Sequence, residues 1–282
     1  MTISVLVYGI SWIGKQFVSI LTAENIQWKA GTSRVDNLTD LRKEISTVNP
    51  THIVSIIGRT HGPGYSTIDY LEQKDKIIDN VRDNLYAPVS LALECQARGI
   101  HFTYIGTGCI FEGYPEGGFT ADSVPNFFGS SYSVVKGFTD RLMHQLPVLN
   151  LRIRMPITGE NHPRNFITKI TNYERICSTP NSMSYLPDLL PVAVLLMKDS
   201  RTGTINLVNP GLISHNEILQ MYKELVHPEF SWVNFTIEEQ DQILASKRSN
   251  NLLNTIDMEL MGVPDIKTSI RKALEHWSIN NN

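Results

Sequence analysis

A tyrosine and a lysine four residues apart are the side chains in this sequence best suited to chemistry. Tyr132 and Lys136 fall in a predicted helix over residues 130–146, where a spacing of four places both on one face. The lysine charge favours the phenolate, so the pattern predicts a Tyr132 pKa below its usual value of about 10. Such a phenol can protonate a carbonyl oxygen while hydride reaches the carbonyl carbon. The alternative for an isolated Tyr-x-x-x-Lys spacing is an amphipathic helix with a buried aromatic and a solvated lysine.

A hydroxyl and a thiol follow a predicted strand over residues 101–106. If the chain stays extended as far as Cys109, the side chains of Thr107 and Cys109 point to the same side, towards the group that Tyr132 contacts. Thr107 can then donate a second hydrogen bond to the carbonyl oxygen, and Cys109 can move protons on the neighbouring carbon. The alternative for Cys109 is a small, buried hydrophobic side chain.

A glycine-containing turn joins the first predicted strand to the first predicted helix. It reads Gly9-Ile10-Ser11-Trp12-Ile13-Gly14 and can aim the backbone amides of the helix start at a pyrophosphate. Glycines also end strands for structural reasons, but this position favours dinucleotide binding. After the second strand stand Ser33 and Arg34, in place of the acidic residue that would bond a ribose 2′-hydroxyl. They can hold a 2′-phosphate, which predicts NADPH; the alternative for Arg34 is a solvated surface arginine.

The elements that must position these residues alternate between strands and helices. Strands are predicted over 3–8, 27–31, 52–57, 101–106 and 149–153, and helices over 12–22, 39–47, 70–98 and 130–146. This order predicts an α/β fold with a Rossmann-type doubly wound parallel sheet. We therefore assign residues 1–155 to an NADP-binding Rossmann domain that includes the Tyr-Lys helix.

The remaining residues, 156–282, have a looser pattern that is rich in Pro, Asn and Ser. Helices are predicted over 189–197 and 214–225, and capping boxes stand at Ser214 to Glu217 and Thr236 to Glu239. This part is expected to form a smaller, mixed α/β substrate-binding cap, with some segments returning to the Rossmann core.

Composition excludes several classes of protein. Among 282 residues, 25 Lys and Arg face 28 Asp and Glu without a long block of either sign, so nucleic acid and anionic membrane are poor candidate partners. Three cysteines without CxxC or Cys/His spacing argue against a disulfide framework and against a metal site. The longest apolar run, 189–197, is too short to cross a bilayer, and the amino terminus lacks a basic leader region. We expect a cytoplasmic protein.

Long runs of the sequence closely resemble the UDP-4-keto-6-deoxy-D-glucose 3,5-epimerase/4-reductases. These enzymes form the carboxy-terminal half of plant rhamnose synthases or stand alone, and they are extended short-chain dehydrogenase/reductases related to dTDP-4-keto-rhamnose reductases and GDP-fucose synthases. The resemblance covers nearly the whole chain. The matching runs are Gly106 to Glu112, Pro125 to Phe127, Arg152 to Ile157, Pro163 to Ile170, Pro180 to Met183, Asn209 to Gly211, Ser214 to Leu219 and Arg248 to Asn251.

The resemblance implies an enzyme with two activities, which epimerises UDP-4-keto-6-deoxy-D-glucose at C3 and C5 and then reduces its C4 ketone with NADPH to form UDP-L-rhamnose. Thr107, Tyr132 and Lys136 match the reductase triad of that family. Cys109 and Lys169 match its acid/base pair for epimerisation, without telling which of them is the base. The alternative for Lys169 is a surface lysine on the helical stretch that follows Asn165.

Further contacts are expected at both ends of the site. Gly58 is assigned to the cofactor, and Thr60, Asn165 and Arg248 are assigned to the substrate, the last two to its nucleotide part. The first loop departs from the family, which usually has GxxGxxG: this chain is one residue shorter and has Ser11 in place of the middle glycine. This departure affects how the backbone of the loop contacts the pyrophosphate.

Two other functions compete with this interpretation. A GDP-sugar epimerase/reductase of the fucose type would share the triad and the cysteine but use a histidine in place of Lys169. A non-catalytic NADP-binding regulatory subunit would not need the intact Thr107, Tyr132 and Lys136. On the favoured interpretation the functional partner is a UDP-glucose 4,6-dehydratase, and a homodimer is one option for the assembly.

Overall fold

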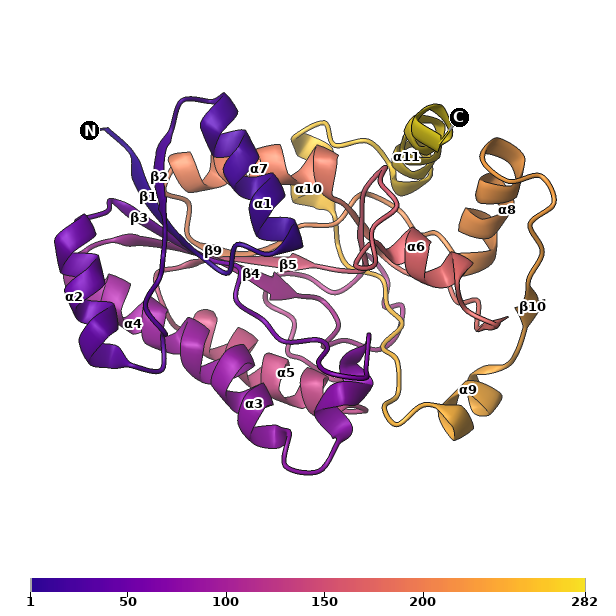
Figure 1. The fold of residues 1–282 in the computed structure, drawn as a ribbon, viewed down its shortest axis with the longest axis horizontal. Helices are drawn as coiled ribbons and strands as arrows, with labels where there is room; N and C mark the ends of the chain where they lie inside the picture. Colours follow the sequence, from indigo (N-terminus) through magenta and orange to yellow (C-terminus); the bar gives the residue numbers. More distant parts are fainter. Residues whose placement is uncertain (1, 282) are drawn as a thin grey trace.

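The sheet at the centre of the molecule has six parallel strands. The computed structural model describes residues 2–281, and Figure 1 shows the sheet with helices on both of its faces. In their order across the sheet the strands are β2 (Gln27–Ala30), β1 (Ser4–Tyr8), β3 (His52–Ser55), β4 (His101–Thr107), β5 (Leu149–Ile153) and β9 (Gly203–Asn206). The chain reverses its direction of winding between β1 and β3, which confirms the doubly wound fold.

The two faces of the sheet bury different helices, because side chains alternate along each strand. On one face, Val5 and Val7 of β1 pack with Phe17 of α1 (Trp12–Ala23) and with α7 (Leu186–Lys198). On the other face, Leu6 packs with α2 (Leu38–Val48) and α4 (Ala87–Arg98), and α5 (Ser131–Met143) lies beside them (Figure 1). The interpretation of residues 189–197 as a cap helix is therefore wrong: its apolar residues cover the sheet beside α1.

The segment predicted as one helix over 70–98 is four shorter elements. They are a 3-10 turn η1 (Ile68–Glu72), α3 (Ile77–Val81), a π-helical turn η2 (Arg82–Tyr86) and α4. The π turn places Asn84 against the loop that follows β3. Its amide accepts from the Arg59 backbone N–H at 2.9 Å and donates to the Arg59 carbonyl at 2.9 Å, so the turn holds the loop that contains Gly58 and Thr60.

The residues after β5 build a second core beside the carboxyl ends of the strands. The helices of this core are α6 (Phe166–Thr171), α8 (His215–Leu225) and α11 (Ile266–Asn281). Helix α9 (Ile237–Ile243) has no buried residue, and Met258 of α10 (Ile256–Leu260) packs in the core on the sheet face that α1 and α7 cover. Two small sheets join the second core, β6 (Pro156–Ile157) with β8 (Ser184–Tyr185), and β7 (Arg175–Ile176) with β10 (Val233–Asn234). Both predicted capping boxes are formed, at the starts of α8 and α9. The domain boundary after residue 155 stays a prediction.

No helix within the described part of the chain combines the length and the apolar character that crossing a membrane requires.

Candidate functional site

A cavity of about 750 Å³ lies where the carboxyl ends of the strands meet the cap. This is where open parallel sheets usually bind ligands. Eleven of the predicted site residues line it, from both parts of the chain: Ser11, Trp12, Ile13, Gly58, Thr60, Thr107, Cys109, Tyr132, Lys136, Lys169 and Arg248. The structure thus brings together residues that are up to 237 positions apart. The predicted residues that stand outside the lining are Gly9, Gly14, Ser33, Arg34 and Asn165.

Hydrogen bonds lock the start of α5 to the turn after β4. Ser130 caps the helix by accepting from the Ser133 backbone N–H at 3.0 Å, and the Ser133 hydroxyl donates to the Cys109 carbonyl at 2.7 Å. On the other side of the turn, the Asn251 amide donates to the carbonyls of Gly108 and Phe111 at 3.0 and 2.8 Å. Because these bonds join the two segments, Tyr132 and Cys109 are held in a defined relation.

Thr107 lies between the thiol and the phenol. Its hydroxyl accepts from the Cys109 backbone N–H at 3.1 Å and is also hydrogen-bonded to Tyr132. Strand β4 ends at Thr107, so the premise that the chain stays extended to Cys109 is wrong. A turn brings Cys109 to the same cavity instead. The Thr107 hydroxyl, the Tyr132 phenol and the Cys109 thiol therefore face the same position in the cavity, where the carbonyl group of a substrate can lie.

The predicted phenolate is not found. Burial raises the pKa of Tyr132, the neighbouring Cys109 raises it further, and the hydrogen bond with Thr107 only partly opposes them. The Lys136 amine donates to the hydroxyl of Tyr104 in β4 and lies 4.6 Å from the centre of that ring. Burial lowers the pKa of Lys136 to about 8, against the raising effect of Asp140. The raised pKa favours the protonated phenol of Tyr132, the form that can donate a proton.

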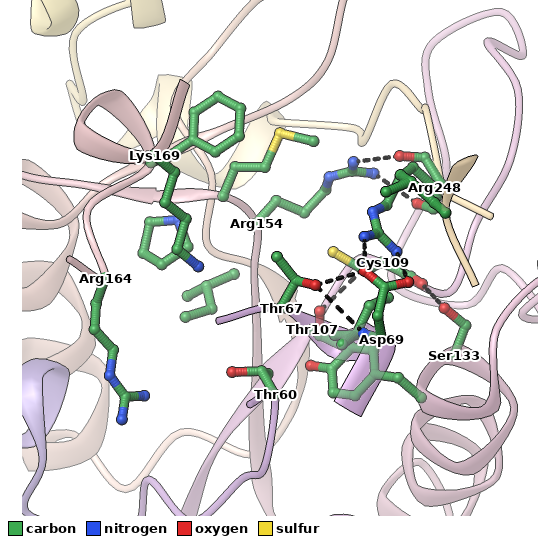
Figure 2. Close-up of a pocket in the computed structure, with 18 of the residues that line it drawn as sticks. Thr60, Thr67, Asp69, Thr107, Cys109, Ser133, Arg154, Arg164, Lys169 and Arg248 are labelled. Carbon is green, nitrogen blue, oxygen red and sulfur yellow. Dashed lines mark hydrogen bonds and ion pairs between the residues drawn. The ribbon is translucent and has the colours of Figure 1, made fainter. Parts of the chain in front are cut away.

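Lys169 reaches the cavity from α6, opposite the thiol. Figure 2 shows its side chain and that of Arg164 on one side, with Cys109 and Thr107 on the other. No hydrogen bond or ion pair to another described residue uses the Lys169 amine. Burial lowers the pKa of Lys169, and the positive charges of Arg164 and Arg248 lower it further. Each of these effects favours the neutral amine, which is the basic form.

Asn165 is not a substrate ligand. It caps α6 by accepting from the Ile167 backbone N–H at 3.2 Å, and its amide nitrogen donates to the carbonyls of Thr158 and Glu160 at 2.9 and 2.6 Å. The side chain is fully buried and lies outside the cavity lining. The prediction is therefore corrected: Asn165 shapes the loop that begins α6, and through α6 it positions Lys169.

The first loop fits a dinucleotide despite its missing residue. Gly9 has φ +86°, and a Cβ there would lie 2.6 Å from the backbone of Ile56 at the end of β3. A Cβ on Gly14 would lie 2.6 Å from the Gly9 carbonyl oxygen. The turn is closed by these two glycines, while Ser11 leaves the first amides of α1 without a side-chain cap. The indole N–H of Trp12 is buried in the cavity wall with no partner among the described residues, which suits a ligand acceptor.

The residues predicted to read a 2′-phosphate lie beyond the cavity lining. The Arg34 guanidinium bonds both oxygens of Asp36, at 3.0 and 2.7 Å, and its side chain is 70% exposed. The Ser33 backbone N–H donates to Glu44 at 3.0 Å, and its hydroxyl donates to the Asp40 carbonyl. The assignment of Ser33 and Arg34 stays a prediction.

Arg248 lines the cavity but is already paired. Its guanidinium bonds the Asp69 carboxylate at 2.5 Å and the hydroxyl of Ser246. Asp69 lies in η1, so this ion pair joins the cap segment to the Rossmann side of the cavity (Figure 2). The expected substrate contact of Arg248 stays a prediction.

Several residues that shape the site went unassigned in the sequence. Arg154 is fully buried, donates to Asn181 and Ser249, and keeps its Nε without a partner among the described residues. It also lines the cavity, as does Arg164, whose guanidinium contacts His61 at 2.6 Å. Both arginines lie in runs that carry the family resemblance, which is the signal that could have found them. Asp69 and Tyr104 had no such signal, because ordinary turn and strand residues surround them.

Comparison with known proteins extends this picture. No family model matches the chain. It is 54% identical over 272 residues to protein L780 of Acanthamoeba polyphaga mimivirus, a match that covers 93% of this chain and 94% of that one. It is 37% identical over 278 residues to the bifunctional dTDP-4-dehydrorhamnose 3,5-epimerase/dTDP-4-dehydrorhamnose reductase of Arabidopsis thaliana, which covers 95% of this chain and 91% of that protein.

A longer plant protein and a solved structure are also similar. The trifunctional UDP-glucose 4,6-dehydratase/UDP-4-keto-6-deoxy-D-glucose 3,5-epimerase/UDP-4-keto-L-rhamnose-reductase RHM1 of Arabidopsis thaliana is 38% identical over 95% of this chain, which spans 41% of RHM1. The crystal structure of the L780 UDP-rhamnose synthase from the mimivirus superposes with a TM-score of 0.95 at 52% identity, over 98% of this chain and 100% of that one. The likeness includes both the sheet and the cap.

Proposed function

Since this chain belongs to the family of 3,5-epimerase/4-reductases of nucleotide-linked 4-keto-6-deoxy sugars, we propose that it converts UDP-4-keto-6-deoxy-D-glucose to UDP-L-rhamnose with NADPH. The observation that carries the proposal is a single cavity lined by two donors for one carbonyl oxygen and by two groups that can exchange protons. The donors are Thr107 and Tyr132, and the proton-exchanging groups are Cys109 and Lys169.

One oxygen of the substrate serves both reactions. The protons at C3 and C5 flank the C4 ketone, so the loss of either creates an enolate whose charge collects on O4. Thr107 and Tyr132 would stabilise that charge, and one well-placed donor of this kind typically contributes about 3 kcal/mol. Their mutual hydrogen bond keeps both groups at the same position. The same donors then polarise the ketone for reduction.

We assign the base of the epimerisation to Lys169 and the acid to Cys109. The Lys169 amine has two cationic neighbours, Arg164 and Arg248, and its pKa is lowered by burial and by both of them. The neutral amine can take a proton from C3 or C5. Cys109, across the cavity, can return a proton to the other ring face. A base and an acid on opposite faces invert one carbon at a time. Lys169 then releases its extra proton to solvent and Cys109 takes one up, so that the same pair can invert the second carbon, as a 3,5-epimerase must.

The reduction uses the same phenol in a second role. NADPH, when bound, supplies hydride to C4. Tyr132 gives its proton to O4, and Thr107 continues to hold that oxygen. Gly9, Gly14 and the start of α1 would hold the pyrophosphate, with Ser11, Trp12 and Ile13 at the cavity wall. Gly58 lies in the loop that Asn84 holds, and it would contact the middle of the bound dinucleotide.

The nucleotide part of the substrate would lie towards the cap. Arg164 and Arg248 place positive charge on the cavity wall, where a diphosphate can accept from guanidinium groups. Thr60 adds a hydroxyl to the same cavity. For Arg248 this contact would compete with Asp69, because both ligands are anionic.

Three wider assignments complete the proposal. The substrate must come from a UDP-glucose 4,6-dehydratase, an activity that RHM1 joins to the matching region in one chain. A homodimer is proposed through exposed apolar side chains on α3, α4 and α5, which light scattering would test; they are Ile77, Ile78, Leu93, Phe138 and Leu142. A cytoplasmic location is proposed because all three cysteines are unpaired thiols, which suit a reducing compartment.

The function is tested by supplying UDP-4-keto-6-deoxy-D-glucose and NADPH in deuterated water. We expect UDP-L-rhamnose that carries deuterium at both C3 and C5. Reduction without label at either carbon would contradict the epimerase activity, and label without NADPH oxidation would contradict the reductase activity. The GDP-linked sugar serves as the control: faster turnover of that substrate would favour the fucose type of enzyme.

A further inference from the structure

The Lys136 amine of α5 is held by Tyr104, which lies in the strand β4 that packs against this helix. Both side chains are buried, with 4% of Lys136 and 1% of Tyr104 exposed. The amine donates to the Tyr104 hydroxyl and lies 4.6 Å from the centre of its ring. Because side chains alternate along a strand, Tyr104 faces α5, whereas Thr107 of the same strand ends at the cavity. Strand β4 therefore contributes to the site from both of its faces.

The nearest carboxylate does not take this role. Asp140 lies one turn further along α5, but its oxygens accept from Arg152 at 2.8 and 2.7 Å and from Asn150 at 2.9 Å. The Arg152–Asp140 pair is buried, so its geometry leaves little freedom to turn towards the amine. Among the described residues, the recorded hydrogen-bond acceptor of the Lys136 amine is the Tyr104 hydroxyl. A buried ammonium without an acceptor would be costly, and Tyr104 supplies that acceptor.

We propose that Tyr104 is a positioning residue for the reduction. Its phenol oxygen accepts a hydrogen bond from the Lys136 amine and so holds that amine beside Tyr132. The inference rests on the proposed function and extends it to a residue outside the cavity lining. Tyr104 does not itself relay protons, because its hydroxyl is fully buried and burial raises the pKa of this phenol well above its usual range. It acts by fixing the place and the charge of Lys136.

The charges around Lys136 predict how the loss of Tyr104 changes the pH dependence. The groups that act on the amine are Tyr104 from β4, Cys109 from the following turn and Asp140 from α5, with Arg152 of β5 bonded to Asp140. Burial already lowers the pKa of Lys136 to about 8. Removing the acceptor hydroxyl favours the neutral amine and lowers this pKa further. The alkaline limb of the reductase profile should then move to lower pH.

The test is Tyr104→Phe, measured by single-turnover NADPH oxidation as a function of pH and by NADPH binding from fluorescence. We expect the oxidation to be about 10-fold slower near pH 8, equal to about 1.4 kcal/mol in the barrier, with the alkaline limb shifted downward. Deuterium uptake at C3 and C5 should persist, since Thr107, Cys109 and Lys169 are untouched. Tyr185→Phe is the matched control: Tyr185 is also buried, but it belongs to the cap core and lies outside the cavity lining.

A double variant separates positioning from general destabilisation. If Tyr104 acts through Lys136, Tyr104→Phe should add nothing to the loss caused by Lys136→Met, and any lowering of the Tm in Tyr104→Phe should be reversed in the double variant. Equal losses in both backgrounds, or an unshifted pH profile in Tyr104→Phe, would overturn the inference. If the unaltered protein forms no UDP-L-rhamnose, the proposed function fails; if it does and Tyr104→Phe matches it, only this inference fails.

Discussion

Replacing Asp69 by asparagine tests how the cap segment around Arg248 is tied to the Rossmann side of the cavity. The Asp69 carboxylate accepts from the Arg248 guanidinium at 2.5 Å, from the Ser246 backbone N–H at 3.0 Å and from the Ser246 hydroxyl at 2.8 Å. Burial alone would raise the pKa of Asp69, but the hydrogen bonds from Arg248, Thr67 and Ser246 hold it at about 2. The charged form is therefore strongly favoured by folding.

The magnitude follows from that difference in pKa. The Asp69 pKa falls from its ordinary value of 3.8 to about 2, and one pKa unit corresponds to about 1.4 kcal/mol, so the charge contributes about 2 kcal/mol to stability. Because the folded pKa is depressed, the contribution is complete above pH 3.8 and is lost as the pH falls through about 2. We expect Asp69→Asn to lower the Tm by roughly 4–8 °C, equally between about pH 6 and about pH 8.

Thermal unfolding followed by calorimetry checks this expectation, and Lys198→Gln is the control. That substitution breaks the exposed ion pair between Lys198 and Glu24, whose side chains are 37% and 35% exposed, and should change stability by less than about 1 kcal/mol. The KM for the nucleotide sugar should fall in Asp69→Asn, since the substrate diphosphate no longer competes with the Asp69 carboxylate for Arg248. A Tm equal to that of the control, or a difference that grows from about pH 6 to about pH 8, would refute the reasoning.

Three further predictions concern the chemistry. Tyr132→Phe should slow NADPH oxidation by about 100-fold or more, because O4 loses its proton donor; undiminished oxidation in stopped flow would remove Tyr132 from the reduction. Cys109→Ala should suppress deuterium uptake far more than it weakens NADPH binding, and equal losses of the two would indicate a structural cysteine. Arg34→Ala should lower the NADPH-to-NADH ratio of kcat/KM, whereas Asp36→Asn should raise it by freeing the guanidinium. An unchanged ratio in both variants would leave Arg34 as a surface residue.

The fold was predictable where local pattern and burial agree. Five strands were placed within two residues of their observed ends. For β1 the reason is its continuous apolar run, which is typical of a strand covered on both faces. The sixth strand, β9 (Gly203–Asn206), was missed: it has four residues, two of them polar, and only pairing with β5 makes it a strand. Two features of the segment 70–98 were also missed: the break between Glu72 and Ile77, and the π turn around Asn84, which contacts the loop after β3.

The sequence predicted many of the residues that line the cavity, but not the electrostatics of that cavity. The spacing of Tyr132 and Lys136 correctly placed both at one cavity. It suggested that the ammonium would lower the phenol pKa, whereas burial raises the pKa of Tyr132 and the amine bonds Tyr104. Burial and distant partners decide a pKa, and neither can be read from a spacing of four. Asn165 was wrongly assigned for a related reason, because a helix cap and a ligand contact use the same amide.

What the sequence determined by itself is the set of local features: the alternation of strands and helices, the glycine turn, the capping boxes of α8 and α9, and the family that its long matching runs indicate. These depend on residues close together in the chain. The tertiary structure alone decided that Lys169 lies across the cavity from Cys109, that Asp69 occupies Arg248 and that Tyr104 holds Lys136. Those relations join residues up to 179 positions apart, and burial and charge act through space rather than along the chain.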